Sequence, residues 1–160
     1  MCGSAQCLWD DLKRLGDWDG DVMAVNLTAL HLPFPVKHWV SFHHEFFETA
    51  VPFLKYLQQR IYQTNPFPIT HSSDEGINVD KVWKFKYHDK SGWFATKIAS
   101  ELGYQSIVLC GIPMDNQPKF YEDKMTNCKL KDYLWEDLPQ ERIRSLSGNT
   151  KKYFGDYLNG

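Results

Sequence analysis

The 160-residue sequence contains no hydrophobic run of the ~20 residues that a helix needs to cross a bilayer. Its first residues also lack the basic segment and the apolar core of a signal peptide. Only four cysteines are present, and none of them forms a Cys-x-x-Cys pair, which argues against a structural zinc site. We therefore expect a cytoplasmic protein with reduced thiols, no membrane span and no bound metal.

Neither sign of charge dominates the chain, because 18 Lys and Arg residues are balanced by 20 Asp and Glu residues. The resulting net charge of −2 argues against broad electrostatic binding to nucleic acid. Familiar catalytic motifs are missing as well. There is no Gly-x-x-x-x-Gly-Lys-Ser/Thr loop, no Gly-x-Ser-x-Gly elbow, no His-Glu-x-x-His helix and no complete Gly-x-Gly-x-x-Gly. No motif of this kind therefore identifies the chemistry of the chain.

The sequence does contain enough apolar material for one folded domain. Apolar residues make up 42% and charged residues 24%, the balance of a globular protein and not of a disordered one. A length of 160 residues suits a single domain over 1–160 with a core of its own. Aromatic residues reach 15%, and packing is the expected role of most of them.

The segment 91–115 is the most informative part of the chain. Ser91-Gly92 forms a small-residue turn, and an amphipathic helix follows and ends at Gly103. Residues 106–110 then form a buried strand, and Gly111-Ile112-Pro113 forms a second turn. This order predicts an α/β protein with a Rossmann-like three-layer fold and a mostly parallel sheet. Both turns are expected at the ligand edge of the sheet, where the backbone can approach a phosphate.

Periodicity and turn residues predict the remaining elements. We expect helices at 8–15, 45–62, 139–145 and 149–158, and strands at 21–26, 37–41, 67–71 and 82–85. Pro52 either begins the regular part of its helix or kinks it. Residues 113–138 are polar and aromatic with little periodicity, which is typical of a lid-like excursion over a site. His71 and His88 are expected at the surface or in loops.

Small polar residues follow most of the predicted strands, at the edge of a parallel sheet where ligands bind. They supply amide and hydroxyl donors without a cluster of acids, which suits a phosphate or a nucleotide. Each also has a plain structural alternative, such as a helix cap for Ser91 or a turn former for Asn26. The candidate binding residues are Gly3, Ser4, Asn26, Ser91, Gly92, Gly111, Ser147 and Asn149.

A pair of histidines follows the strand expected at 37–41. His43-His44-Glu45 has metal-ligating residue types, but adjacent side chains at a strand end point apart and no third histidine has ligand spacing. Because both histidines are expected near the pocket, His43 and His44 are the best candidates for a general base.

Five segments, taken in order, carry a resemblance to a known family. Residues 91–92 with 99–104 and 107–112 match a Ser-Gly, Ala-Leu-Gly-Tyr and Gly-Ile-Asp pattern, and residues 147–150 match Ser-x-Asn-Thr. Residues 3–8 are similar to a Gly-x-Gly-Pro-Ser-Leu loop, 22–26 to a strand that ends in a nucleotide-contacting Asn, and 39–43 to the next strand. In these features the chain resembles the bacterial sialyltransferases and their glycosyltransferase-like relatives, in a small phage or prophage form.

The resemblance implies a Rossmann-like domain that binds a nucleotide-linked sugar, CMP-linked in that family, without a metal or another cofactor. It implies that Tyr121 acts as a lid tyrosine that holds the leaving phosphate. It also implies a nucleotide pocket lined by Ser4, Asn26, His43, Ser91 and Gly92.

The chain departs from that family at three places. Leu146 stands where the family has its catalytic histidine, just before Ser-x-Asn-Thr, and a leucine cannot take a proton. The strand that should precede Gly3 is reduced to residues 1–2, so either this strand is truncated or another segment fills its place. The excursion has no clear counterpart of the family's phosphate-binding arginine, for which Lys90 or Lys119 would substitute.

Three functions are consistent with this pocket. The first is glycosyl transfer from a nucleotide-linked sugar. The second is binding or sequestering of a nucleotide or nucleotide-sugar without turnover, which Leu146 favours. The third is nucleotide hydrolysis by a water molecule near His43 or Asp115. The expected partner is a nucleotide or nucleotide-sugar ligand in each case, and the sequence leaves open whether the chain forms a homo-oligomer.

Overall fold

The computed structural model describes residues 1–57, 67–86, 90–122 and 135–159. Four strands pair in the order of the chain: β1 (Met23–Val25), β2 (His38–Val40), β3 (Ile69–Ser72) and β4 (Lys81–Val82). A second pair consists of β5 (Ile107–Leu109) and β6 (Ile143–Ser145). Every one of these pairings is parallel, so the expected α/β class with a mostly parallel sheet is confirmed.

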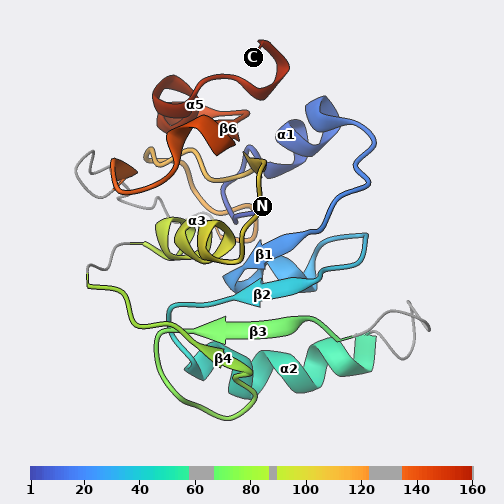
Figure 1. Ribbon diagram of the computed structural model, residues 1–160. Helices are drawn as coiled ribbons and strands as arrows, with labels where there is room; N and C mark the ends of the chain where they lie inside the picture. Colours follow the sequence, from blue (N-terminus) through green and yellow to red (C-terminus); the bar gives the residue numbers. More distant parts are fainter. Residues whose placement is uncertain (58–66, 87–89, 123–134, 160) are drawn as a thin grey trace.

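Residues 1–3 join the two sets of strands. Cys2 forms a parallel bridge with Ala24 on one side and with Cys110 on the other. The Cys2 amide donates to the Met23 carbonyl at 2.8 Å, and the Cys110 amide donates to the Met1 carbonyl at 2.9 Å. The strand order is therefore β4-β3-β2-β1, residues 1–3, β5-β6, and the N-terminus lies in the middle of the molecule (Figure 1). This short segment fills the place of the first strand.

Two apolar clusters lie on opposite faces of the strands, because neighbouring residues of a strand point to opposite sides. The odd-numbered residues of β1 and β5 pack with α3 (Ser91–Glu101). Their even-numbered neighbours, Ala24 and Val108, pack with α1 (Leu8–Leu15), α2 (Glu45–Leu57) and the 3-10 helix η1 (Asn26–Leu30). Helices thus cover both faces. None of the helices that the structure describes is long and apolar enough to cross a membrane.

Pro52 lies inside α2, which already begins at Glu45, so the regular helix does not start at the proline. A proline at this position removes one backbone hydrogen bond, but the buried face of α2, including Phe47 and Val51, holds the helix in place. The expected continuation over 58–62 lies outside the described residues.

The helix predicted at 139–145 is wrong. A 3-10 helix, η3 (Gln140–Arg142), is followed there by strand β6. Ile143 and Ser145 are buried and Arg144 between them is not, a two-residue alternation that is too short to recognise in the sequence. Pairing with β5 decides the conformation. The next helix, α5 (Gly148–Phe154), ends sooner than predicted, at Gly155, before a 3-10 turn, η4 (Tyr157–Asn159).

The surface position expected for His71 is also wrong, because this side chain is fully buried in β3. It belongs to a chain of hydrogen bonds. The Trp83 Nε1–H donates to His71 Nδ1 at 3.0 Å, and His71 Nε2 lies 2.9 Å from His38 Nδ1. His38 Nε2 lies 2.9 Å from the Tyr104 hydroxyl, which donates to Asp21 Oδ2 at 2.6 Å.

The direction of this chain follows from its first member. The indole of Trp83 can only donate, so His71 Nδ1 must accept and His71 Nε2 must carry the proton. His38 Nδ1 then accepts in turn, and its Nε2–H donates to Tyr104. All donors point from Trp83 toward Asp21, and this order requires both histidines to be neutral. His88 lies outside the described residues.

Candidate functional site

A cavity of about 600 Å³ lies at the carboxyl ends of the central strands. Four chain segments that are far apart in the sequence form its wall: the loop after residues 1–3, the end of β1, the start of α3 and the segment after β5. Six of the residues expected at the site from the sequence line this one cavity: Gly3, Ser4, Asn26, Ser91, Gly92 and Gly111.

Two glycines bring the central turns into backbone contact on the floor of the cavity. A Cβ atom on Gly3 would lie 2.5 Å from the Gly111 carbonyl oxygen, and a Cβ atom on Gly111 would lie 2.7 Å from the Gly3 carbonyl oxygen. Gly111 also has a φ of +64°, a conformation that other residues rarely adopt. Only glycine at both positions allows the two turns to approach this closely, and a ligand can then meet bare backbone.

Asn26 follows β1 and begins η1 with a positive φ of 52°, and Met114, which also lines the cavity, has a φ of 50°. Left-handed backbone of this kind is tolerated by asparagine but strained for methionine, and strained residues concentrate at functional sites. The Ser41 hydroxyl shares its one proton between Asn26 Oδ1, at 3.1 Å, and the His43 carbonyl, at 2.9 Å. The amide oxygen is thus engaged, and the Nδ2 group of Asn26 supplies the N–H donors with which this side chain can meet a ligand.

The amino end of α3 brings positive charge to the cavity. Its N-cap residue, Lys90, makes no side-chain capping bond, and Ser91 and Gly92 of the first turn line the cavity together with it. A helix amino terminus carries unpaired amides and a partial positive charge, which favours an anion. Lys119, on the opposite wall, pairs with Glu122 at 2.9 Å, and this carboxylate raises the pKa of the lysine.

Asp11 supports the site but does not line the cavity, and the sequence did not single it out. Its Oδ2 accepts a bond from the Gly111 amide at 2.8 Å and another from the Ser147 hydroxyl at 2.7 Å. Burial raises the pKa of this carboxyl group. The sequence could have identified Asp11, because this residue lies three residues after Leu8, on the apolar face of α1. A carboxylate on a buried helical face needs hydrogen-bond partners.

Ser147, Asn149 and Tyr121 surround the cavity but do not line it. Asn149 Nδ2 donates to the Met114 carbonyl at 3.0 Å, so this residue holds the wall, as Ser147 does through Asp11. The Tyr121 ring stacks on His31 with 5.7 Å between the ring centroids. Residues 113–122 of the expected excursion thus form one wall of the cavity, and its part at 123–134 lies outside the described residues.

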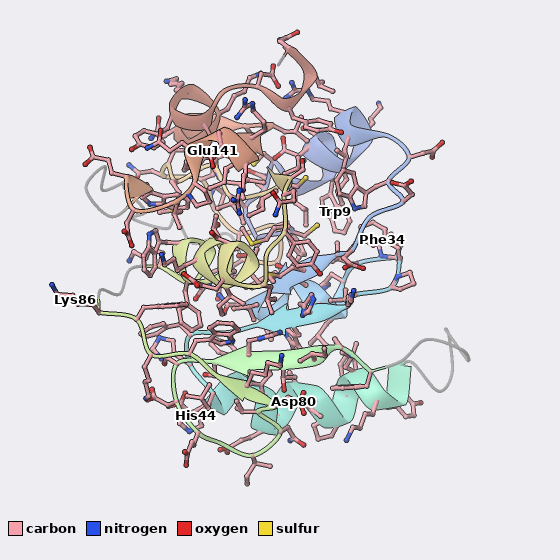
Figure 2. The ribbon with its side chains drawn as sticks, in the orientation of Figure 1. Trp9, Phe34, His44, Asp80, Lys86 and Glu141 are labelled. Atoms are coloured by element: carbon pink, nitrogen blue, oxygen red, sulfur yellow. The ribbon has the colours of Figure 1, made fainter. Side chains whose placement is uncertain are left out.

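The two histidines expected as general bases do not line the cavity either. His43 follows β2 near Asn26, since both its carbonyl and Asn26 Oδ1 lie within hydrogen-bond distance of the Ser41 hydroxyl. The His43 ring packs against Phe42, with 5.3 Å between the centroids. His44 lies beside α2 and β4, at the end of the molecule away from α1 (Figure 2). The structure therefore brings His43 near this edge and leaves His44 away from it.

Within the described residues, no group of three or more His, Cys, Asp or Glu side chains is placed to hold a metal ion. Comparison with known proteins found no matching family model, no matching curated protein and no matching solved structure. The chemistry of the cavity is therefore inferred from its own residues.

Proposed function

We propose that the chain binds a nucleotide or nucleotide-linked sugar in this cavity, as a glycosyltransferase-like protein with a Rossmann-like fold. One observation carries the proposal. The cavity lies between residues 1–3 and β5, where the order of the strands reverses. In open α/β sheets, the crevice at the carboxyl ends of the strands on either side of such a reversal is the usual ligand site. A volume of about 600 Å³ falls within the range of small-molecule sites.

Two parts of the lining suit the two ends of such a ligand, while the carboxylates of Asp115 and Glu122 stand on the wall formed by residues 113–122. Lys90, Ser91 and Gly92 form a cationic end for a phosphate. Asn26 offers amide donors in the same cavity as the apolar side chains of Ile112 and Met114, a combination that suits a base or a sugar.

Replacing Ser91 with aspartate tests the phosphate end. The new carboxylate stands in the first turn of α3, where it is compatible with the helix dipole, so the fold is retained. It repels a phosphate in the cavity, and we expect the dissociation constant for CMP to rise at least about tenfold, corresponding to about 1.4 kcal/mol. Isothermal titration calorimetry of the two proteins with CMP measures the change.

The matched control places the same charge elsewhere on the same helix. Ser100 lies near the carboxyl end of α3 and does not line the cavity, so Ser100→Asp should change CMP affinity less than about twofold. Equal loss of affinity in the two variants, or no binding of CMP, UDP or their sugar conjugates by the unmodified protein, would argue against a phosphate at this helix.

Binding without glycosyl transfer is the second candidate function. Leu146 is fully buried in the cluster around α1, and no histidine is among the residues that line the cavity in the described part of the chain. Incubation with a CMP-linked sugar separates the two candidates. Recovery of the unchanged compound supports binding alone, whereas release of CMP supports an enzyme. Loss of that release in His43→Ala would assign the general base to His43.

A further inference from the structure

Residues 1–3 and the segment that follows β5 contain the same dipeptide, Cys-Gly. Gly3 and Gly111 line the candidate ligand cavity, while Cys2 and Cys110, which precede them, belong to the apolar cluster around α1. Both cysteines also line a second cavity of about 450 Å³. Most of the side chains that line this second cavity are apolar, among them Leu12, Leu15, Phe34 and Val108. Trp18 and the acidic residues Asp17 and Asp21 line the rest of it.

The backbone places the two thiols side by side. Cys2 and Cys110 form a parallel bridge, in which the Gly3 amide donates to the Cys110 carbonyl at 2.8 Å. Bridge partners on adjacent strands point to the same side of the sheet, and neighbouring strands are about 4.8 Å apart. This separation falls within the range of roughly 4.4–6.8 Å between the Cα atoms of a disulfide.

The two thiols also differ in character. The hydrogen bond with Cys110 lowers the pKa of the Cys2 thiol, whereas the same contact and burial raise the pKa of the Cys110 thiol. Cys2 is therefore the better nucleophile of the pair. The Cys110 thiol lies next to it and can react with a sulfenic acid formed on the Cys2 sulfur.

We propose that Cys2 and Cys110 form a reversible oxidation site, at which a peroxide converts the two thiols into a disulfide. The Cys2 thiolate attacks one oxygen of hydrogen peroxide, the O–O bond breaks, and hydroxide leaves as water after taking a proton. Cys110 then attacks the sulfur of the Cys2 sulfenic acid. The S–S bond forms, the S–O bond breaks, and a second water leaves with the Cys110 proton. Two thiols and one peroxide thus give one disulfide and two waters.

Oxidation of Cys2 and Cys110 is expected to change the shape of the candidate ligand cavity. The Gly3 and Gly111 backbones lie too close for a Cβ atom at either position and both line the cavity, so a shift of either preceding cysteine moves a wall of the cavity. We expect the oxidised chain to bind CMP several-fold more weakly. This consequence rests on the proposed function, whereas the disulfide itself does not.

The test uses the full chain with Cys7→Ser and Cys128→Ser, which leaves only the proposed pair. After treatment with hydrogen peroxide, we expect an intact mass lower by two hydrogen atoms, a Cys2–Cys110 cross-linked peptide in a non-reducing digest, and recovery of both thiols with dithiothreitol. Adding Cys110→Ser should abolish the cross-link and leave sulfenic or sulfinic acid on Cys2.

Free, alkylatable Cys2 and Cys110 after peroxide treatment would overturn the proposal, as would stable sulfinic acid on Cys2 while Cys110 is present. If the Cys110→Ser protein does not fold, the same peptide map is made on the unmodified chain after peroxide treatment. A disulfide that joins Cys2 or Cys110 to Cys7 or Cys128 would then also overturn the proposal. Because these readouts need no nucleotide, a disulfide without CMP binding rejects the proposed function alone.

Discussion

Replacement of Gly111 with alanine is expected to lower the free energy of unfolding by about 4 kcal/mol. Two costs combine. A residue other than glycine is strained at the φ of +64° found here, and the new Cβ atom would lie 2.7 Å from the Gly3 carbonyl oxygen and 2.8 Å from Leu8 Cβ. Backbone and Cβ atoms cannot turn away, so the central strands must separate. Urea denaturation followed by circular dichroism measures the loss.

Gly103→Ala is the matched control for this prediction. Gly103 has a φ of +86°, but nothing lies within 4 Å of the position that its Cβ atom would occupy. Only the conformational cost applies there, and we expect a loss of about 1 kcal/mol. Similar losses in the two variants would show that the close contact at the cavity floor has no energetic importance.

Acidification from pH 7 to about pH 5 is expected to lower the free energy of unfolding by about 2 kcal/mol through His71. Burial, with further contributions from His38 and Lys81, lowers the pKa of His71 from 6.5 to about 4. Between these values the unfolded chain binds a proton that the folded chain does not bind. The contribution of His71 to the free energy of unfolding is therefore fully present above the pKa of this histidine in the unfolded chain. It is lost as the pH falls toward the pKa of His71 in the folded chain.

His71→Gln isolates this contribution, because glutamine keeps an acceptor for Trp83 and a donor for His38 but does not titrate. Urea denaturation at several pH values should show a much flatter pH dependence for this variant. His44→Gln, a substitution of a partly exposed histidine outside the network, should keep the dependence of the unmodified protein. A steep dependence that persists in His71→Gln would contradict the assignment.

The sequence predicted best those segments whose conformation depends on residues close to them along the chain. The turn, helix, glycine and strand of 91–110 were predicted from local pattern alone, and the structure has them as α3 and β5. The candidate cavity residues could be predicted because strand ends in a parallel sheet share one edge, so a position in the chain implies a position in space.

The features that could not be predicted depend on contacts across the whole chain. Residues 1–3 carry too little pattern to indicate a strand, and only β1 and β5 on either side make them one. His71 becomes buried because Trp83 and His38 satisfy both of its ring nitrogens. His43 and His44 were predicted from their place after a strand, but the direction of a side chain beyond a strand end is not encoded in that order.

The bridges that Cys2 forms with Ala24 and with Cys110 connect the two sets of strands, and this has a consequence for folding. The strands of 23–82 and those of 107–145 each have an open edge before they join, at β1 and at β5. Among the residues that the structure describes, residues 1–3 are the segment that pairs with both edges. The Cys2 partner Cys110 lies 108 residues further along the chain (110 − 2), so this pairing closes a long loop and is slow to form. Until it forms, each half presents unpaired backbone that another copy can occupy, which makes the partly folded chain prone to aggregation at its centre.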